Sequence, residues 1–104
     1  MGAESLKGHL DGMILAVLGS APAHGYAVIE ELKQRSGGVF DLPEGTVYPA
    51  LHRLEAEGLL ASAWADASGR RRRIYRLTRR GRAALGERRT EWRRFSHAVE
   101  CVLA

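Results

Sequence analysis

Two groups of side chains in this 104-residue chain are of the types that bind nucleic acids. The first is a run of four arginines, Arg70 to Arg73. An arginine guanidinium presents a planar fork of hydrogen-bond donors, which matches phosphate oxygens and the edge of guanine. The second group lies in the segment 44–60, where hydroxyl, aromatic and basic side chains stand between apolar positions. The two groups together suggest a DNA-binding protein, provided that the fold brings them to one surface.

The segment 44–58 has the spacing of an amphipathic helix. Apolar residues recur at positions 47, 51 and 54 and therefore share one helix face. Pro49 is tolerable if the helix begins near Gly45 or Thr46, because its missing N–H would then be one of the unbonded donors of the first turn. Residues near the start of such a helix meet base edges in the major groove. The expected DNA contacts from this helix are Gly45, Thr46, Tyr48, Pro49, His52 and Arg53.

Three of these residues also have purely structural interpretations. Tyr48 can be a core aromatic whose hydroxyl reaches water, and His52 can be a solvated helix residue. Arg53 can form a salt bridge with Glu57, one helical turn further on. The sequence leaves both interpretations open for each residue.

The arginine run falls in a predicted β-hairpin. Leu60, Ser62 and Trp64 alternate with three alanines over 60–65, and a second two-residue alternation runs over 72–77. A turn containing Asp66, Ala67, Ser68 and Gly69 separates the two strands. A hairpin that follows a DNA-reading helix is typically a wing. We expect Arg70 and Arg71 at its tip to contact phosphates or minor-groove edges, with Arg72 beside them.

Two further helices are predicted upstream. Apolar residues at positions 10, 13, 14, 17 and 18 follow the helical spacing in full, and Pro22 prevents that helix from continuing. A second helix runs from about Gly25 to Ser36. Its N-terminus is a potential phosphate site to which Tyr26 would add a hydrogen bond. Packing of Tyr26 between helices is the alternative.

The last predicted helix begins after Thr78, a favourable N-cap, and runs to about residue 103. Its apolar residues recur at heptad spacing, interrupted only by Arg88, which predicts a seam between two copies of the chain. The expected dimerisation residues are Leu85, Trp92, Phe95, Val99 and Val102. A planar aromatic effector could stack on Trp92 and Phe95, although plain interface packing also explains them.

These elements predict a mainly α fold with a small β-hairpin. The second and third helices, joined by a short connection, match a helix-turn-helix, and the hairpin adds a wing. The expected organisation is a winged helix-turn-helix domain over residues 1–77 and a C-terminal dimerisation helix over residues 78–104.

Charge is unevenly distributed along the chain. Residues 1–69 contain four Lys or Arg and nine Asp or Glu, a net charge of −5, whereas residues 70–94 contain twelve Arg and two Glu, a net charge of +10. This asymmetry suggests an anionic partner met by one side of the molecule.

Other classes of function find little support. The single cysteine, Cys101, excludes an internal disulfide, and the four histidines show no metal-ligand spacing. We find no catalytic motif and expect no enzyme activity, cofactor or metal. No apolar run is long enough to cross a membrane, so a cytoplasmic protein is expected.

The order and spacing of four blocks resemble the PadR family of transcriptional regulators. The blocks are LDGMILAVL, HGYAVIEEL, GTVYPALHRLEAEGLL and GRRRRIYRLTRRGRAAL, between residues 10 and 85. The resemblance implies a homodimeric winged helix-turn-helix protein that binds a palindromic operator and usually represses transcription, released by a small molecule or another signal. The single helix after the wing resembles the small subgroup of the family. The alternative is a winged-helix module that binds protein and not DNA.

Overall fold

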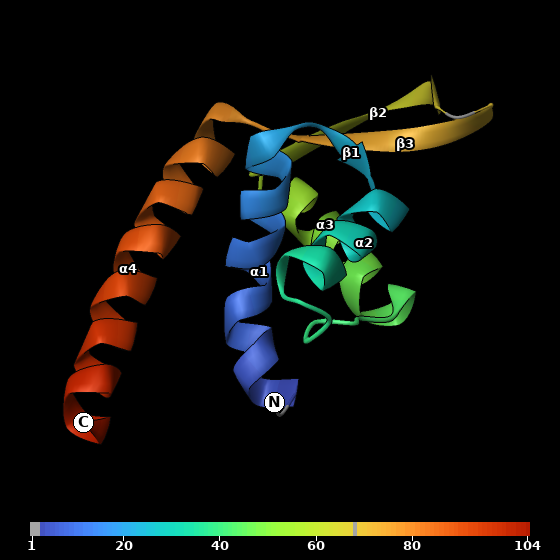
Figure 1. The fold of residues 1–104 in the computed structure, drawn as a ribbon. Coiled ribbons are helices and arrows are strands. Elements are labelled where there is room, and N and C mark those ends of the chain that lie inside the picture. Colours follow the sequence, from blue (N-terminus) through green and yellow to red (C-terminus); the bar gives the residue numbers. More distant parts are fainter. Residues whose placement is uncertain (1–2, 68) are drawn as a thin grey trace.

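The computed structural model describes residues 3–67 and 69–104 and contains four helices and a small antiparallel sheet among them (Figure 1). The elements in chain order are α1 (Ala3–Ser20), β1 (Ala23–His24), α2 (Gly25–Arg35), α3 (Glu44–Ala56), β2 (Leu60–Ala67), β3 (Arg70–Leu77) and α4 (Arg79–Leu103). This arrangement confirms the predicted mainly α, winged helix-turn-helix fold. The sheet order is β1-β3-β2, so the two-residue strand β1 extends the predicted hairpin on the side of β3.

The apolar faces predicted for the first three helices form one core. α1 contributes Leu10, Ile14, Val17 and Leu18, and the inner face of the hairpin closes the core with Leu60, Tyr75 and Leu77. α2 and α3 complete it with Val28, Ile29, Leu32, Val47, Ala50, Leu51 and Leu54. The helical periodicity of the sequence thus identified these buried faces, because burial on a helix repeats every three to four residues.

The start of α3 differs from the prediction. The helix begins at Glu44, and the N–H groups of Thr46 and Val47 both donate to the Pro43 carbonyl, at 3.0 and 3.2 Å. Pro49 therefore lies in the second turn, where it cannot donate to the carbonyl of Gly45. Both residues are exposed, so water can hydrate that carbonyl.

The wing is longer than the prediction. β2 and β3 pair from Leu60 with Leu77 out to Ala67 with Arg70. Asp66 and Ala67, expected in the turn, belong to β2 instead, and Ser68 lies outside the described residues. Gly69 has a φ of 74°, a conformation that glycine adopts at little cost, and this lets the chain reverse within a short connection.

α4 begins as predicted, with Thr78 as its N-cap. The Thr78 hydroxyl accepts a hydrogen bond from the Gly81 N–H at 3.0 Å and donates to the Gly58 carbonyl at 2.7 Å. The helix then runs antiparallel to α1 and diverges from it toward the C-terminus (Figure 1). Only Gly81 and Leu85 of its 25 residues are buried, so most of α4 faces away from the core.

None of the helices in the described part of the chain combines the length and the hydropathy that a membrane span requires.

Candidate nucleic-acid interface

α3, the start of α2 and the wing surround one groove. It is lined by His24, Gly25, Tyr48, His52, Trp64, Arg70, Arg71, Arg72, Arg73 and Tyr75. The structure thus brings the predicted residues Tyr48, His52 and the arginine run to a common surface. Arginine guanidinium groups beside aromatic rings are the chemistry expected for phosphates and base edges.

Tyr48 connects α3 with the N-terminus of α2. It is half-buried, and a Cβ added to Gly25 would lie 2.7 to 2.9 Å from three atoms at the hydroxyl end of its side chain. The His52 ring meets the Tyr48 ring edge to face, with 6.5 Å between the ring centres. The Tyr48 ring therefore packs between helices, as the structural interpretation predicts, and its side chain also lines the groove, where its contact with DNA stays a prediction.

Trp64 is a wing residue that the sequence reasoning did not include among the DNA contacts. Its indole is 55% exposed, and the guanidinium carbons of Arg71 and Arg73 lie 5.9 and 5.6 Å from its ring centre. Arg73 also approaches Glu55 of α3 at 3.7 Å. Stacking on Trp64 restricts the rotamers of both arginines before any ligand arrives. The alternation of Leu60, Ser62 and Trp64 in the sequence could have placed Trp64 on the same face of the strand as the buried Leu60.

Arg72 and His24 lie together where β1 meets β3. The Nδ1 atom of His24 caps α2 by accepting the Ala27 N–H at 3.1 Å, which requires a neutral imidazole. Burial lowers the pKa of His24, and the positive charge of Arg72 lowers it further. The buried Nε of Arg72 has no hydrogen-bond partner among the residues that the structure describes. At this corner of the groove Arg72 therefore keeps a free hydrogen-bond donor, and His24 is neutral while it caps α2.

Arg53 points toward α1. Its guanidinium donates two hydrogen bonds to the Asp11 carboxylate, at 2.6 and 2.9 Å, and approaches Glu57 only at 3.5 Å. The hydrogen bonds that Arg53 donates to the Asp11 carboxylate raise the pKa of Arg53. An ion pair was one of the two sequence interpretations, but its main partner is Asp11, which is 42 residues away in sequence. The residue is half-exposed, yet its donors are largely occupied inside the molecule.

The outer face of α3 lies opposite the core and carries small or short side chains at Gly45 and Pro49. Gly45, Pro49 and His52 are exposed on the side opposite the core, and Thr46 is half-buried at the edge. Tyr26, at the start of α2, is 50% exposed. A face with glycine and proline on it allows the helix backbone to approach a ligand closely.

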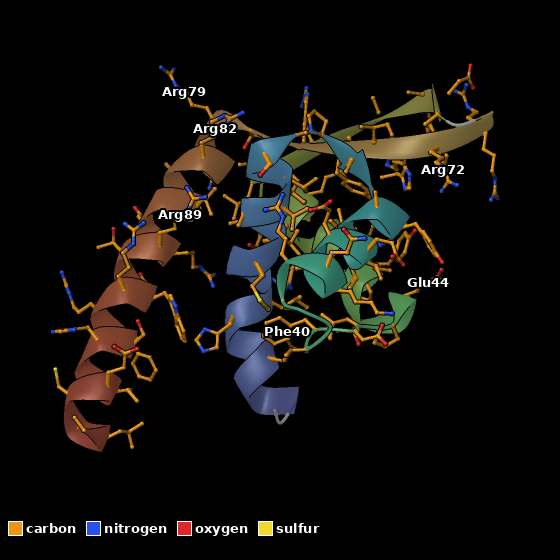
Figure 2. All side chains as sticks on the ribbon, viewed as in Figure 1. Phe40, Glu44, Arg72, Arg79, Arg82 and Arg89 are labelled. Carbon is orange, nitrogen blue, oxygen red and sulfur yellow. The ribbon has the colours of Figure 1, made fainter. Side chains whose placement is uncertain are left out.

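The basic segment 70–94 divides between two parts of the molecule. Arg72 lies on the wing, whereas Arg79, Arg82 and Arg89 lie on α4, at the opposite end of the view (Figure 2). The net charge of the segment therefore overstates the charge at the groove, where four arginines contribute.

The predicted dimerisation seam divides in the same way. Leu85 belongs to the core of the single chain and is 6% exposed, so it does not lie on the outer seam. Trp92, Phe95 and Val102 are 51, 58 and 84% exposed, and Val99 continues the same stripe. The rings of Trp92 and Phe95 are adjacent, with 6.1 Å between their centres.

Comparison with known proteins confirms the resemblance. A protein of Lysinibacillus sphaericus is 30% identical over 101 residues, which are 96% of this chain and 93% of that protein. A transcriptional regulator of Mycobacterium tuberculosis is 48% identical over 64 residues, 62% of this chain and 57% of that protein. A crystal structure of a PadR family transcription regulator from Clostridium difficile superposes with a TM-score of 0.83 at 32% identity, covering 92% of this chain and 99% of that one.

The model of the transcriptional regulator PadR-like family matches residues 14–87, which include the C-terminal part of α1, all of α2 and α3, the wing and the first turns of α4. The chain therefore belongs to the PadR-like family of transcriptional regulators.

Proposed function

We propose that this protein is a sequence-specific DNA-binding regulator that represses transcription and is released by a small molecule or another signal. The observation that carries the proposal is the groove in which four arginines of the wing meet α3 and the N-terminus of α2. Membership of a family of transcriptional regulators supports it. An anionic polymer is the partner that suits such a surface.

In this proposal α3 enters the major groove of DNA. Its face of Gly45, Pro49 and His52 would lie closest to the bases, with Thr46 and Tyr48 at the two edges. Arg70 and Arg71 of the wing would reach the flanking phosphates or the minor groove. The N-terminus of α2, with Tyr26, would bind a phosphate through its unbonded N–H groups.

Two copies of the chain would bind together. The exposed stripe of Trp92, Phe95, Val99 and Val102 on α4 is an apolar surface that a second copy would cover. A twofold dimer requires a palindromic operator, with half-site centres separated by about 10 base pairs or a multiple of that spacing.

The signal would act at this dimer seam. A planar aromatic effector that stacks on Trp92 and Phe95 would bind the two arrangements of the dimer with different affinities. That difference would shift the spacing of the two α3 helices and release the operator.

Selection of bound sequences from a random DNA pool, followed by fluorescence anisotropy with the enriched duplex, tests the proposal. An enriched palindrome and a steep salt dependence are expected. The double variant Arg70→Ala, Arg71→Ala should weaken binding to all duplexes and reduce the slope of log K against log salt by about 2.

The double variant Arg79→Ala, Arg82→Ala is the matched control, because it removes the same charge from α4, away from the groove (Figure 2). A loss of binding in the control alone would contradict the proposed surface. Wild-type protein without salt-dependent DNA binding would favour the protein-binding alternative.

A further inference from the structure

Asp11 of α1 is a buried charged residue that contacts two other helices. Its carboxylate accepts both hydrogen bonds of the Arg53 fork from α3, at 2.6 and 2.9 Å. The same carboxylate lies 3.7 Å from the Arg88 guanidinium of α4. The Asp11 side chain is 13% exposed. One carboxylate thus joins the proposed DNA-reading helix to the proposed dimerisation helix.

Burial makes this cluster sensitive to the loss of any member. A carboxylate removed from water is stable only when cations and hydrogen bonds replace its hydration. Arg53 supplies the stronger, two-bond contact, and Arg88 supplies the weaker one. If Arg88 moves away, Arg53 alone must neutralise the Asp11 carboxylate, and the geometry of the α1–α3 contact must adjust.

Arg88 also explains the interruption of the heptad seam. It occupies a position that a dimer helix normally fills with an apolar residue. Its side-chain stem lies on the backbone of α1, where a Cβ added to Gly12 would be 3.5 Å from the Arg88 Cβ. Its Nη1 donates to the Gly8 carbonyl at 3.5 Å. Arg88 is therefore directed inward, toward α1.

We infer that Asp11 is a positioning residue for DNA recognition, which sets the orientation of α3 according to the position of α4. This inference rests on the proposed function. In the proposed complex Asp11 does not contact DNA. The carboxylate holds Arg53 and Arg88 at a common point, so a movement of α4 that displaces Arg88 changes the contact that fixes α3. The bridge supplies a physical link between the dimer seam and the reading helix.

The decisive variant is Asp11→Asn, which keeps the shape of the side chain and removes its charge. We expect its affinity for the selected operator to fall about tenfold, within the range of ordinary couplings between sites. Affinity for a scrambled duplex should change less than twofold, because the phosphate contacts remain. Glu57→Gln is the matched control, since it removes only the longer 3.5 Å contact of Arg53, and it should bind like the wild type.

A competing role for Asp11 predicts the opposite sign. If Asp11 only withholds Arg53 from DNA, Asp11→Asn would free that guanidinium and strengthen binding to every duplex, which would overturn the inference. Equal losses on operator and scrambled DNA would overturn it as well. Failure of the wild-type protein to bind DNA would instead refute the proposed function, so the two failures are distinguishable.

Arg88→Gln tests the link to α4. It should reproduce most of the operator loss of Asp11→Asn, and the double variant should be no weaker than Asp11→Asn alone. Sedimentation must show that each variant remains a dimer at the concentration of the binding assay. An Arg88→Gln protein with wild-type operator affinity would overturn the link.

If Asp11→Asn fails to fold, Arg53→Lys provides the same test with the charges retained. Lysine keeps the positive charge but loses the two-bond fork. A reduced ratio of operator to scrambled affinity supports the inference, and an unchanged ratio overturns it.

Discussion

The substitution of alanine for glycine should have opposite effects at two positions of α4. Gly81 and Gly86 are five residues apart on the same helix. A Cβ added to Gly81 would lie 2.0 Å from the Leu59 carbonyl oxygen and 3.1 Å from the Leu59 carbonyl carbon. A Cβ added to Gly86 would meet no atom within 4 Å. Gly81 is therefore required by the close approach of α4 to the connection between α3 and β2, and Gly86 is not.

The magnitudes follow from these contacts. In an open helix position, alanine is more stable than glycine by about 1 kcal/mol, so Gly86→Ala should stabilise the protein by up to about that amount. Gly81→Ala gains the same helix propensity but must displace backbone. Overpacking of this kind costs about 1–3 kcal/mol. The displaced Leu59 carbonyl also accepts the Thr78 N–H at 3.1 Å, and loss of that bond costs about 1 kcal/mol more. The net expectation is a destabilisation of about 1–3 kcal/mol.

Urea and thermal unfolding of the two variants and the wild type, at one protein concentration, test this prediction. For a chain of this size about 1 kcal/mol corresponds to roughly 4–8 °C in Tm. Gly86→Ala should raise Tm by a few degrees, and Gly81→Ala should lower it by about 5–20 °C on the same scale. A Gly81→Ala protein as stable as Gly86→Ala would refute the packing of α4 against Leu59.

Three further predictions concern the groove and the seam. Trp64→Leu should keep the hairpin but release Arg71 and Arg73 from their stacked positions. Anisotropy should then show DNA affinity reduced by up to about five- to thirtyfold, which corresponds to roughly 0.5–1 kcal/mol for an exposed cation–π contact at each of the two arginines; unchanged affinity would remove Trp64 from the interface. Burial lowers the pKa of His24 in the folded state below its ordinary value of 6.5, so stability should be full above that pH and fall as the pH drops below it, because the unfolded chain binds the proton more tightly. His24→Asn keeps an N-cap that does not titrate and should flatten this part of the stability curve between pH 7.5 and 5.5, and a curve identical to that of the wild type would contradict the assignment. Trp92→Glu should give monomers in sedimentation, since it places a charge in the exposed apolar stripe, and a persistent dimer would move the interface elsewhere.

Local patterns in the sequence predicted most of the fold. The buried faces of α1, α2 and α3 follow from helical periodicity, and Thr78 follows from its capping chemistry. The short strand β1 could not be predicted, because two residues are too few to show alternation. The start of α3 was misplaced because Pro49 was assigned to the first turn, whereas the exposed helix tolerates it in the second.

The site was predictable only where its members are close in sequence. The arginine run and the polar face of α3 were visible as local groups, and the fold joins them in one groove. The pairing of Arg53 with Asp11 depends on how α3 packs on α1, which no local pattern encodes. Of the three residues in the cluster, only Arg88 stood out in the sequence, as a charge that interrupts the heptads of α4.

The apolar stripe of α4 should make the stability of the protein depend on its concentration. Leu85 is covered by the core of the same molecule, whereas Trp92, Phe95 and Val102 are more than half exposed. If two chains form the proposed dimer, their association contributes part of the folding free energy. The unfolding temperature should then rise with protein concentration. An operator that binds two copies side by side would raise their local concentration and so favour the dimer. Dilution would then weaken occupancy of the operator and the stability of the regulator together, and the response of such a regulator would be steeper than binding to one site allows.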